Sequence, residues 1–266
     1  MNRSVTRWTV RDNRAEKNRT DLTLLREEPL SIRIQGKPYT VVMRTPGDEI
    51  AHVAGFCLGE GIVDTPDDFL TLGYCDADVN VVTATLNPEC EKRVSGILMR
   101  RGFISQTSCG ICGKELIEDL KGHIPRVDSS AGINLITAYD SLKHLSDHQP
   151  LRSKTRAAHG VVLFNPEGLC LSAAEDVGRH NALDKASGRL FLEKKLDQVS
   201  YLVLSSRISY EMVQKAARAR IPAVFALSRP TALAVSLAEE LHMTLASMDG
   251  SHGLFVFCGH HRLNAG

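Results

Sequence analysis

In the second half of the chain, short continuous runs of apolar residues alternate with longer stretches in which apolar residues recur with helical periodicity. Runs of the first kind are typical of buried strands, and stretches of the second kind are typical of helices. We expect strands at 160–164, 168–172, 199–205, 222–227, 243–246 and 254–258, and helices at 180–193, 210–220 and 230–242. The resulting order, β-β-α-β-α-β-α-β-β, predicts an α/β fold whose sheet is covered by helices on both faces.

The first half of the chain has a different pattern. Apolar and polar residues alternate from Pro29 to Arg44 on either side of Gly36-Lys37, which predicts a β-hairpin. Further elements are expected at 48–60 (helix), 80–86 (strand), 91–101 (helix) and 133–148 (helix). Up to residue 101 these elements predict a small α+β unit.

These patterns divide the chain into three segments. Residues 1–26 are polar and rich in Arg, Asn and Lys, so we expect a flexible, poorly ordered arm. Residues 27–130 are expected to form an α+β domain that ends in a loop with two cysteines. The stretch 125–132 has little periodicity and marks the boundary with a second domain at 131–266.

Composition and charge narrow the class of protein. The chain has 266 residues, 43% of them hydrophobic and 24% charged, as in ordinary soluble proteins. Its net charge of +1 provides no basic field that favours nucleic acid. No apolar run approaches the roughly 20 residues that span a bilayer, and the N-terminus lacks the apolar core of a secretory signal. We therefore expect a cytoplasmic protein that binds neither nucleic acid nor membrane.

The first candidate for chemistry is the pair Cys109 and Cys112, which lies in the glycine-containing segment 105–114. Glycine after each cysteine favours an exposed, mobile turn. The expected helix at 115–120 places the thiols near a helix N-terminus, where the dipole favours thiolate. A pair of this kind is a dithiol redox centre, half of a metal site, or a sulfur-carrying nucleophile. Zinc requires two further ligands, and no second pair of suitable spacing exists, so we expect no metal. The other five cysteines are expected to be small buried hydrophobic residues.

Polar residues also follow several of the expected strands. Arg179 opens the helix after the hairpin, Arg207 follows the next strand, and the segment 228–232 follows the one after that. Ligands bind at the carboxyl ends of strands in open α/β sheets, and helix starts favour anions. Together these strand ends predict a pocket for a phosphorylated ligand. His159 is interpreted as a structural core histidine.

Five segments together resemble one family, the FdhD/NarQ accessory sulfurtransferases of formate dehydrogenase. The segments are Leu58–Ile62, Ser108–Gly113, Glu175–Lys185, Ser205–Lys215 and Pro230–Val235. The resemblance covers nearly all of the chain after the N-terminal arm. It implies a cytidine-deaminase-like α/β/α sandwich for the C-terminal half, although the zinc-binding elements of a deaminase are missing.

The resemblance also implies a function. A member of this family takes sulfur from a cysteine desulfurase as a persulfide on Cys109, with Cys112 as a neighbour that assists transfer. The sulfur passes to the bis(molybdopterin guanine dinucleotide) form of the molybdenum cofactor, the bound substrate, before the cofactor enters formate dehydrogenase. The resemblance further suggests a homodimer.

In this family the cofactor contacts a glycine-containing turn that usually carries an arginine or lysine. The corresponding residues here are Met248, Asp249, Gly250, Ser251, His252 and Gly253. Because this turn has an aspartate and no arginine, we expect either weaker binding of the cofactor or binding that relies more on Arg207 and Arg179.

Two other functions remain open on the sequence alone. One is a chaperone that binds and delivers the molybdenum cofactor without moving sulfur, for which both cysteines are dispensable and the two arginines are not. The other is a general dithiol oxidoreductase, for which Cys109 and Cys112 cycle through a disulfide.

Overall fold

The computed structural model describes residues 1–75, 78–100, 124, 126–128, 132–250 and 253–265. Its largest part is a six-stranded sheet with the order β13-β12-β11-β10-β8-β9. The strands are β8 (His159–Phe164), β9 (Cys170–Asp176), β10 (Tyr201–Arg207), β11 (Ala223–Ser228), β12 (Thr244–Asp249) and β13 (Gly253–Cys258). Strands β10, β11 and β12 pair in parallel, while β8 is antiparallel to both β9 and β10. Strands β9, β10, β11 and β12 therefore all run in one direction.

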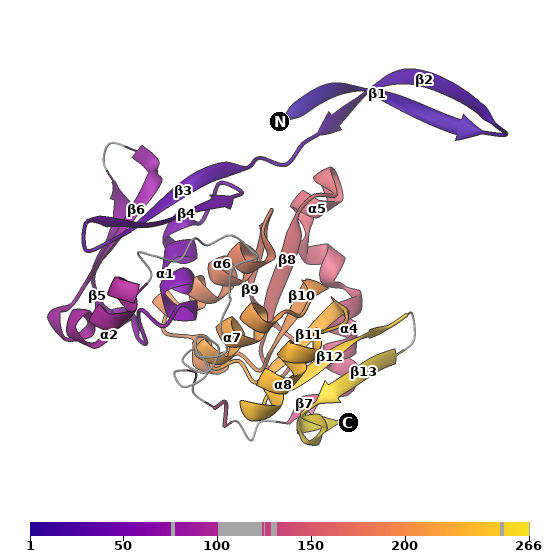
Figure 1. Ribbon diagram of the computed structural model, residues 1–266. Coiled ribbons are helices and arrows are strands. Elements are labelled where there is room, and N and C mark those ends of the chain that lie inside the picture. The colour runs from indigo at the N-terminus through magenta and orange to yellow at the C-terminus, as the bar shows by residue number, and fades with distance from the viewer. Residues whose placement is uncertain (76–77, 101–123, 125, 129–131, 251–252, 266) are drawn as a thin grey trace.

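Helices cover both faces of this sheet (Figure 1). On one face lie α6 (Arg179–Leu192), α7 (Tyr210–Arg218) and α8 (Ala232–Glu240), which bury the apolar side chains of that face together with α1 (Glu49–Gly59). On the other face, α4 (Leu135–Lys143) and the 3₁₀ turn Leu145–His148 pack over a second core that includes Phe164, Tyr201 and Phe225. The predicted α/β fold with a sheet covered on both faces is confirmed.

A four-stranded sheet with the order β4-β3-β6-β5 forms the N-terminal part of the body. Its strands are β3 (Glu28–Ile34), β4 (Lys37–Arg44), β5 (Phe69–Cys75) and β6 (Asp78–Leu86), and α2 (Pro88–Arg100) follows β6. The hairpin predicted at 29–44 and the predicted strand near 80–86 are confirmed. The sequence did not predict β5, because apolar and polar residues do not alternate along it. In the structure, the register of β5 with β6 also shifts twice.

Two glycines let α1 and α6 cross in close contact. A Cβ atom added to Gly188 in α6 would overlap the carbonyl oxygen of Ala51 in α1. A Cβ atom added to Gly55 in α1 would overlap the carbonyl oxygen of Asp184 in α6. The two helix backbones therefore touch, and this contact joins the N-terminal part to the six-stranded sheet in one continuous hydrophobic core.

We expect the Gly188→Ala variant to lose about 2–3 kcal/mol of unfolding free energy, because the two helices must move apart to admit one methyl group. Urea unfolding measures this difference. The matched control is Gly73→Ala in β5, where an added Cβ meets no atom within 4 Å. The control is expected to stay within about 0.5 kcal/mol of the parent protein. Equal stability of the two variants would contradict the close helix crossing.

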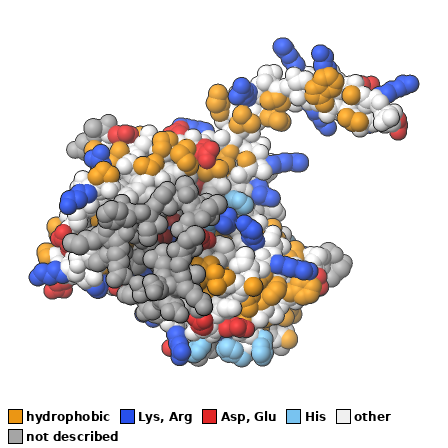
Figure 2. Space-filling view, viewed as in Figure 1, with side chains coloured by type: hydrophobic (Ala, Val, Ile, Leu, Met, Phe, Trp, Pro, Cys, Tyr) orange, Lys and Arg blue, Asp and Glu red, His pale blue; other side chains and the backbone are white. Residues whose placement is uncertain are grey.

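The N-terminal segment differs from the expectation of a poorly ordered arm. Residues Asn2–Arg11 (β1) and Arg14–Thr23 (β2) form an antiparallel hairpin that extends away from the body (Figure 1). The polar composition suggested disorder. Instead, Asp12 and Asn13 adopt the positive φ angles of a two-residue hairpin turn, and the residues on either side of the turn pair as strands. No residue of the hairpin is buried, and Trp8 is 60% exposed. Figure 2 shows basic and hydrophobic side chains together on this exposed hairpin.

The helix predicted at 133–148 is interrupted. α4 ends at Lys143, a 3₁₀ turn follows, and the short helix α5 (Pro150–Thr155) begins at a proline. Proline disfavours helical geometry in the residue before it but suits the first turn of a helix, so Pro150 separates the two elements. Two short strands, β7 (Ile133–Asn134) and β14 (Leu263–Asn264), pair beside α4. Within the described part of the chain, no helix is long and apolar enough to cross a membrane.

Candidate functional site

The predicted strand ends meet at one edge of the six-stranded sheet. Because β9, β10, β11 and β12 run in the same direction, they all end at this edge, which we call the carboxyl edge. β8 and β13 start there. Helices α6, α7 and α8 each begin within four residues of the end of the preceding strand. Sequence segments that are far apart thus converge, as the prediction of a common pocket requires.

At the end of β9, two neighbouring carboxylates face opposite sides of the sheet and both are already used. Asp176 is fully buried and lies 2.7 Å from the Lys185 ammonium. It also accepts hydrogen bonds from the backbone N–H of Thr45 (3.0 Å) and Gly178 (2.9 Å). Glu175 instead accepts from the first backbone N–H groups of α5, at 2.6 Å and 2.8 Å. These carboxylates hold the protein together and are not free to bind a ligand.

A layer of buried charges lies behind the carboxyl edge, between α1, α6 and α7. Lys215 in α7 donates to both carboxylate oxygens of Asp184 in α6, at 2.9 Å and 3.0 Å. Burial raises the pKa of Asp184, although Lys215 opposes this rise. His52 in α1 is fully buried, and its burial, together with the positive charges of Lys185 and Lys215, lowers its pKa to about 3. His52 is therefore neutral at physiological pH.

At the starts of α6 and α7, the side chains of a histidine and a glutamate lie next to each other. His180 Nε2 lies 3.3 Å from a carboxylate oxygen of Glu211. The Ser209 hydroxyl donates to the same oxygen at 3.0 Å. The hydrogen bond to His180 lowers the pKa of Glu211 to about 2, although burial opposes this. Glu211 is thus a carboxylate at neutral pH, with its negative charge directed at His180.

The two arginines predicted to bind the ligand, Arg179 and Arg207, both lie at the carboxyl edge, at the start of α6 and the end of β10. Within the described residues, no carboxylate lies within ion-pair distance of either guanidinium group. Both positive charges are therefore available to a ligand as far as the described part of the chain is concerned.

The predicted turn after β12 also lies at the carboxyl edge. Met248 and Asp249 end β12, Gly250 has a φ of 55°, and Gly253 starts β13, while Ser251 and His252 lie outside the described residues. The positive charge that this turn lacks is present beside it. Arg229, just after β11, lies over the ring of Phe255 in β13 at 4.9 Å from its centroid.

Cys109, Cys112 and the helix predicted at 115–120 lie outside the described residues. The other five cysteines are free thiols, of which Cys57, Cys90 and Cys258 are buried and Cys75 and Cys170 are half-buried. Burial raises the pKa of Cys57, Cys90, Cys170 and Cys258. Those four thiols are therefore protonated at neutral pH. The expectation of buried core residues is confirmed for Cys57, Cys90 and Cys258 and is wrong for Cys75 and Cys170. In the described part of the chain, no group of three or more His, Cys, Asp or Glu residues is placed to hold a metal ion.

His159 differs from its interpretation as a structural histidine. It is the first residue of β8, it is half-buried at the carboxyl edge, and its Nδ1 atom has no hydrogen-bond partner in the structure. Burial lowers its pKa, and the positive charges of Arg179 and Arg152 lower it further. The position of His159 at this edge follows from the topology of the sheet. Because β8 is antiparallel to β10, the first residue of β8 lies at the edge where β10 ends.

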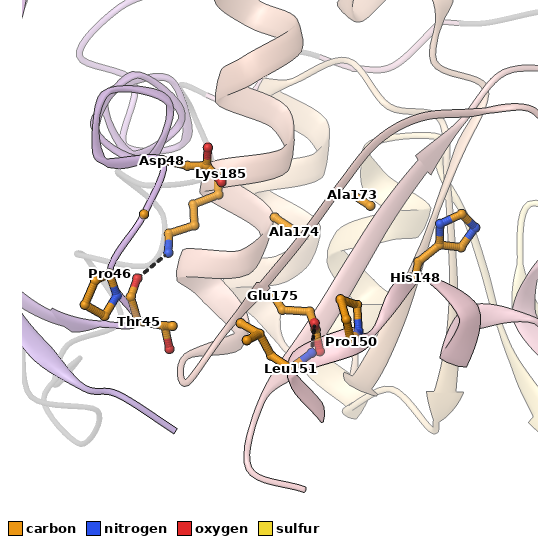
Figure 3. A pocket seen from close by; sticks show the side chains of 11 residues that line it. Thr45, Pro46, Asp48, His148, Pro150, Leu151, Ala173, Ala174, Glu175 and Lys185 are labelled. Carbon is orange, nitrogen blue, oxygen red and sulfur yellow. Dashed lines mark hydrogen bonds between the residues drawn. The ribbon is translucent and has the colours of Figure 1, made fainter. Parts of the chain in front are cut away.

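In the described part of the chain, a cavity of about 410 Å³ lies at the opposite edge of the sheet, beside His242 and His260, and a smaller one borders the carboxyl edge at Glu175. The smaller cavity has a volume of about 210 Å³, and it runs along the outer side of β9, between the turn Thr45–Asp48 and α5 (Figure 3). Lys185 lines it, but the Lys185 ammonium donates to the carbonyl oxygen of Thr45 at 2.6 Å. The polar groups of this cavity are thus largely engaged with one another, so the carboxyl edge remains the candidate site.

Comparisons with known proteins agree on one family. The model of the FdhD/NarQ family matches residues 25–264. The sulfur carrier protein FdhD of Mycobacterium tuberculosis is 38% identical over 240 residues, which cover 85% of this chain and 86% of that protein. The FdhD protein of Xanthomonas campestris is 36% identical and covers 97% of this chain and 92% of its own.

A solved structure has the same fold. The crystal structure of a protein from Desulfotalea psychrophila, described as a formate dehydrogenase accessory protein, superposes with a TM-score of 0.74 over 99% of both chains, at 20% identity. At that identity the likeness speaks for the fold alone. The match of the family model over most of the chain, together with relatives above one-third identity, shows that the chain belongs to the FdhD/NarQ family.

Proposed function

We propose that this protein is a sulfur carrier in the maturation of formate dehydrogenase, with Cys109 as the carrying residue. The observation that carries the proposal is the segment Ser108–Gly113 in a chain whose relatives are named sulfur carrier proteins. Thiols elsewhere are poor alternatives because burial keeps at least four of them protonated.

In the first step, the Cys109 thiolate attacks the terminal sulfur of a persulfide on a cysteine desulfurase. The donor S–S bond breaks, the donor cysteine leaves as a thiolate, and a new S–S bond forms on Cys109. In the second step, the Cys112 thiolate attacks Sγ of Cys109, and the terminal sulfur leaves as hydrosulfide. The cysteine pair is then a disulfide, which a cellular thiol reduces.

The acceptor in this proposal is the bis(molybdopterin guanine dinucleotide) molybdenum cofactor, bound as substrate at the carboxyl edge. Hydrosulfide replaces an oxo ligand of the molybdenum with uptake of one proton and release of water. Arg179, Arg207 and the turn Met248–Gly253 would bind the nucleotide ends of the cofactor, and their convergence at one edge supports this assignment. We further propose that the C-terminal half is a cytidine-deaminase-like sandwich and that the protein is cytoplasmic. In this proposal the protein is a homodimer that binds both the cysteine desulfurase and formate dehydrogenase.

The test of the sulfur step is the Cys109→Ala variant. We expect a folded protein that gains no sulfur from a desulfurase and supports no formate dehydrogenase activity. In the parent protein, intact-mass spectrometry should detect an addition of about 32 Da, one sulfur atom, that maps to Cys109. The matched control is Cys75→Ala, a half-buried thiol outside the motif, which should retain both the adduct and the activity. Full enzyme activity with Cys109→Ala would overturn the proposal.

A second function is favoured by the free arginines at the carboxyl edge. A chaperone that delivers the molybdenum cofactor without carrying sulfur needs Arg179 and Arg207 but neither cysteine of the pair. For that function, the Cys109→Ala variant would remain active and the sulfur adduct would be absent, while the Arg179→Gln variant would be inactive.

A further inference from the structure

A group of basic side chains from α5 and α6 lies near His159 at the β8–β9 end of the carboxyl edge. Arg152 in α5 donates from Nη1 to the carbonyl oxygen of Ala158 at 3.0 Å, which holds its guanidinium beside the start of β8. The charges of Arg179, Arg152 and His180 each act on His159 and lower its pKa.

Arg207 lies at the same edge by the register of the sheet. Leu204 in β10 lies opposite Val161 in β8, and the Ser205 hydroxyl accepts from the backbone N–H of Gly160 at 2.8 Å. Two residues further along β10, Arg207 ends the strand near the start of β8. The guanidinium groups that act on the His159 ring are those of Arg152 in α5 and Arg179 in α6.

The carboxylates near this group are already engaged. Asp176 is held by Lys185 and by backbone N–H groups, Glu175 accepts from the start of α5, and Glu211 accepts from Ser209 and pairs with His180. Within the described residues, Arg152, like Arg179 and Arg207, has no carboxylate at ion-pair distance. The protein thus gathers positive charge here without neutralising it, which is unfavourable unless an anion binds.

Two shielded nitrogen atoms in this group also have no partner. The Nδ1 atom of His159 and the Nε atom of Arg179 are hidden from solvent and make no hydrogen bond in the described structure. A buried polar group without a hydrogen-bond partner is unfavourable. Uncompensated guanidinium groups and unsatisfied nitrogens at the same point both indicate a missing acceptor with several oxygen atoms.

We propose that Arg152, His159 and Arg179 form a diphosphate-binding subsite. A diphosphate provides more than one negative charge and several acceptor oxygens, which suits guanidinium groups from different elements better than a single carboxylate does. Arg179 is the first residue of α6, a helix of 14 residues, whose positive dipole end also favours an anion here. Only the identity of the molecule that carries the diphosphate, a guanine dinucleotide, rests on the proposed function.

The first test is calorimetric titration of the full-length protein with inorganic pyrophosphate in a phosphate-free buffer. We expect binding that weakens about tenfold or more in Arg152→Gln and in Arg179→Gln, since each removes a charge-assisted hydrogen bond. The matched control is Arg156→Gln, an exposed arginine at the end of α5, which should bind as the parent protein does. Absence of pyrophosphate binding, or an equal loss in the control, would overturn the subsite.

A second measurement keeps the test decisive if a variant is unstable. NMR titration of the His159 ring reports its pKa directly. Bound pyrophosphate should raise this pKa, because an anion favours the imidazolium form, and Arg179→Gln without ligand should raise it as well, because a nearby cation is removed. An unchanged His159 pKa in the presence of pyrophosphate argues against the subsite.

The proposal of the diphosphate subsite and the proposal of the sulfur transfer step can be refuted independently of each other. Uptake of sulfur by Cys109 does not need a bound diphosphate, so the parent protein should gain about 32 Da from a desulfurase whether or not pyrophosphate is present. If pyrophosphate binds while Cys109 takes up no sulfur, the proposed function is wrong and the subsite stands. If Cys109 takes up sulfur while pyrophosphate does not bind, the subsite alone is wrong.

Discussion

On acidification from pH 7 to pH 5, the parent protein should lose about 2 kcal/mol more unfolding free energy than the His52→Gln variant. His52 lies in α1 with no exposed surface, and its burial and two neighbouring lysines lower its pKa to about 3. In the unfolded chain the ring has an ordinary histidine pKa of about 6.5. The unfolded state therefore takes up a proton over a range of pH in which the folded state does not.

The direction of the change in stability with pH follows from this difference in the pKa of His52 between the folded and unfolded states. Above about pH 6.5 the ring is neutral in both states, and the full stability is present. As the pH falls below 6.5, protonation favours the unfolded state, and stability is lost until the pH reaches the folded pKa of about 3. By pH 4 the expected difference between the two proteins is about 3 kcal/mol. Asp184, whose pKa is raised by burial, is present in both proteins, so its contribution largely cancels.

Urea unfolding at pH 7, 6, 5 and 4 measures this effect, with His144→Gln as the control. His144 is exposed on the surface after α4, so its replacement should leave the acid dependence of the parent protein unchanged. Parallel stability curves for the parent and His52→Gln would mean that His52 takes up a proton in the folded state.

The positions of the strands and helices in the second half could be predicted because their signals are local. Continuous apolar runs, helical periodicity and the proline before α8 each act within about ten residues. Once the strands share a direction, the convergence of Arg179, Arg207 and the Met248–Gly253 turn follows from topology. For this reason the position of these residues at one edge of the sheet could be predicted, whereas their binding role stays a prediction.

The roles of individual polar residues could not be predicted, because they depend on contacts far apart in sequence. Glu175 and Asp176 are neighbours, yet one caps α5 and the other holds Thr45, 131 residues away. Lys185 and Lys215 look like surface lysines on amphipathic helices, but both are almost fully buried. His159 was assigned to the core because the sequence does not reveal which residues lie beside the start of β8.

The ion pair of Asp176 and Lys185 should have the largest effect of any single position in the described fold. Replacing Asp176 with Ala is expected to lower the unfolding free energy by about 3–5 kcal/mol, because it leaves a buried ammonium group without its counter-charge. The Lys185 ammonium lies 2.7 Å from the carboxylate, and the two side chains are 2% and 0% exposed. The variant also removes the acceptor for backbone N–H groups of Thr45 and Gly178.

The double variant Asp176→Asn with Lys185→Met separates charge from packing. Asn keeps one carbonyl oxygen, which can accept from the backbone N–H of Gly178, and Met fills the volume of the lysine stem without a charge, so part of the lost stability should return. The control for an ordinary salt bridge is Asp67→Ala, which breaks the exposed pair with Lys194 and should cost less than about 1 kcal/mol.

The same experiment reports on the site, since Asp176 also accepts from the Asn181 side chain at 2.8 Å and so fixes the first turn of α6. If the subsite is correct, Asp176→Ala should weaken pyrophosphate binding even at temperatures where the protein remains folded, because Arg179 loses its fixed position. The double variant, which keeps an acceptor for Gly178, should recover binding together with stability. A double variant that recovers stability but not binding would mean that the negative charge of Asp176, rather than its hydrogen bonds, positions Arg179.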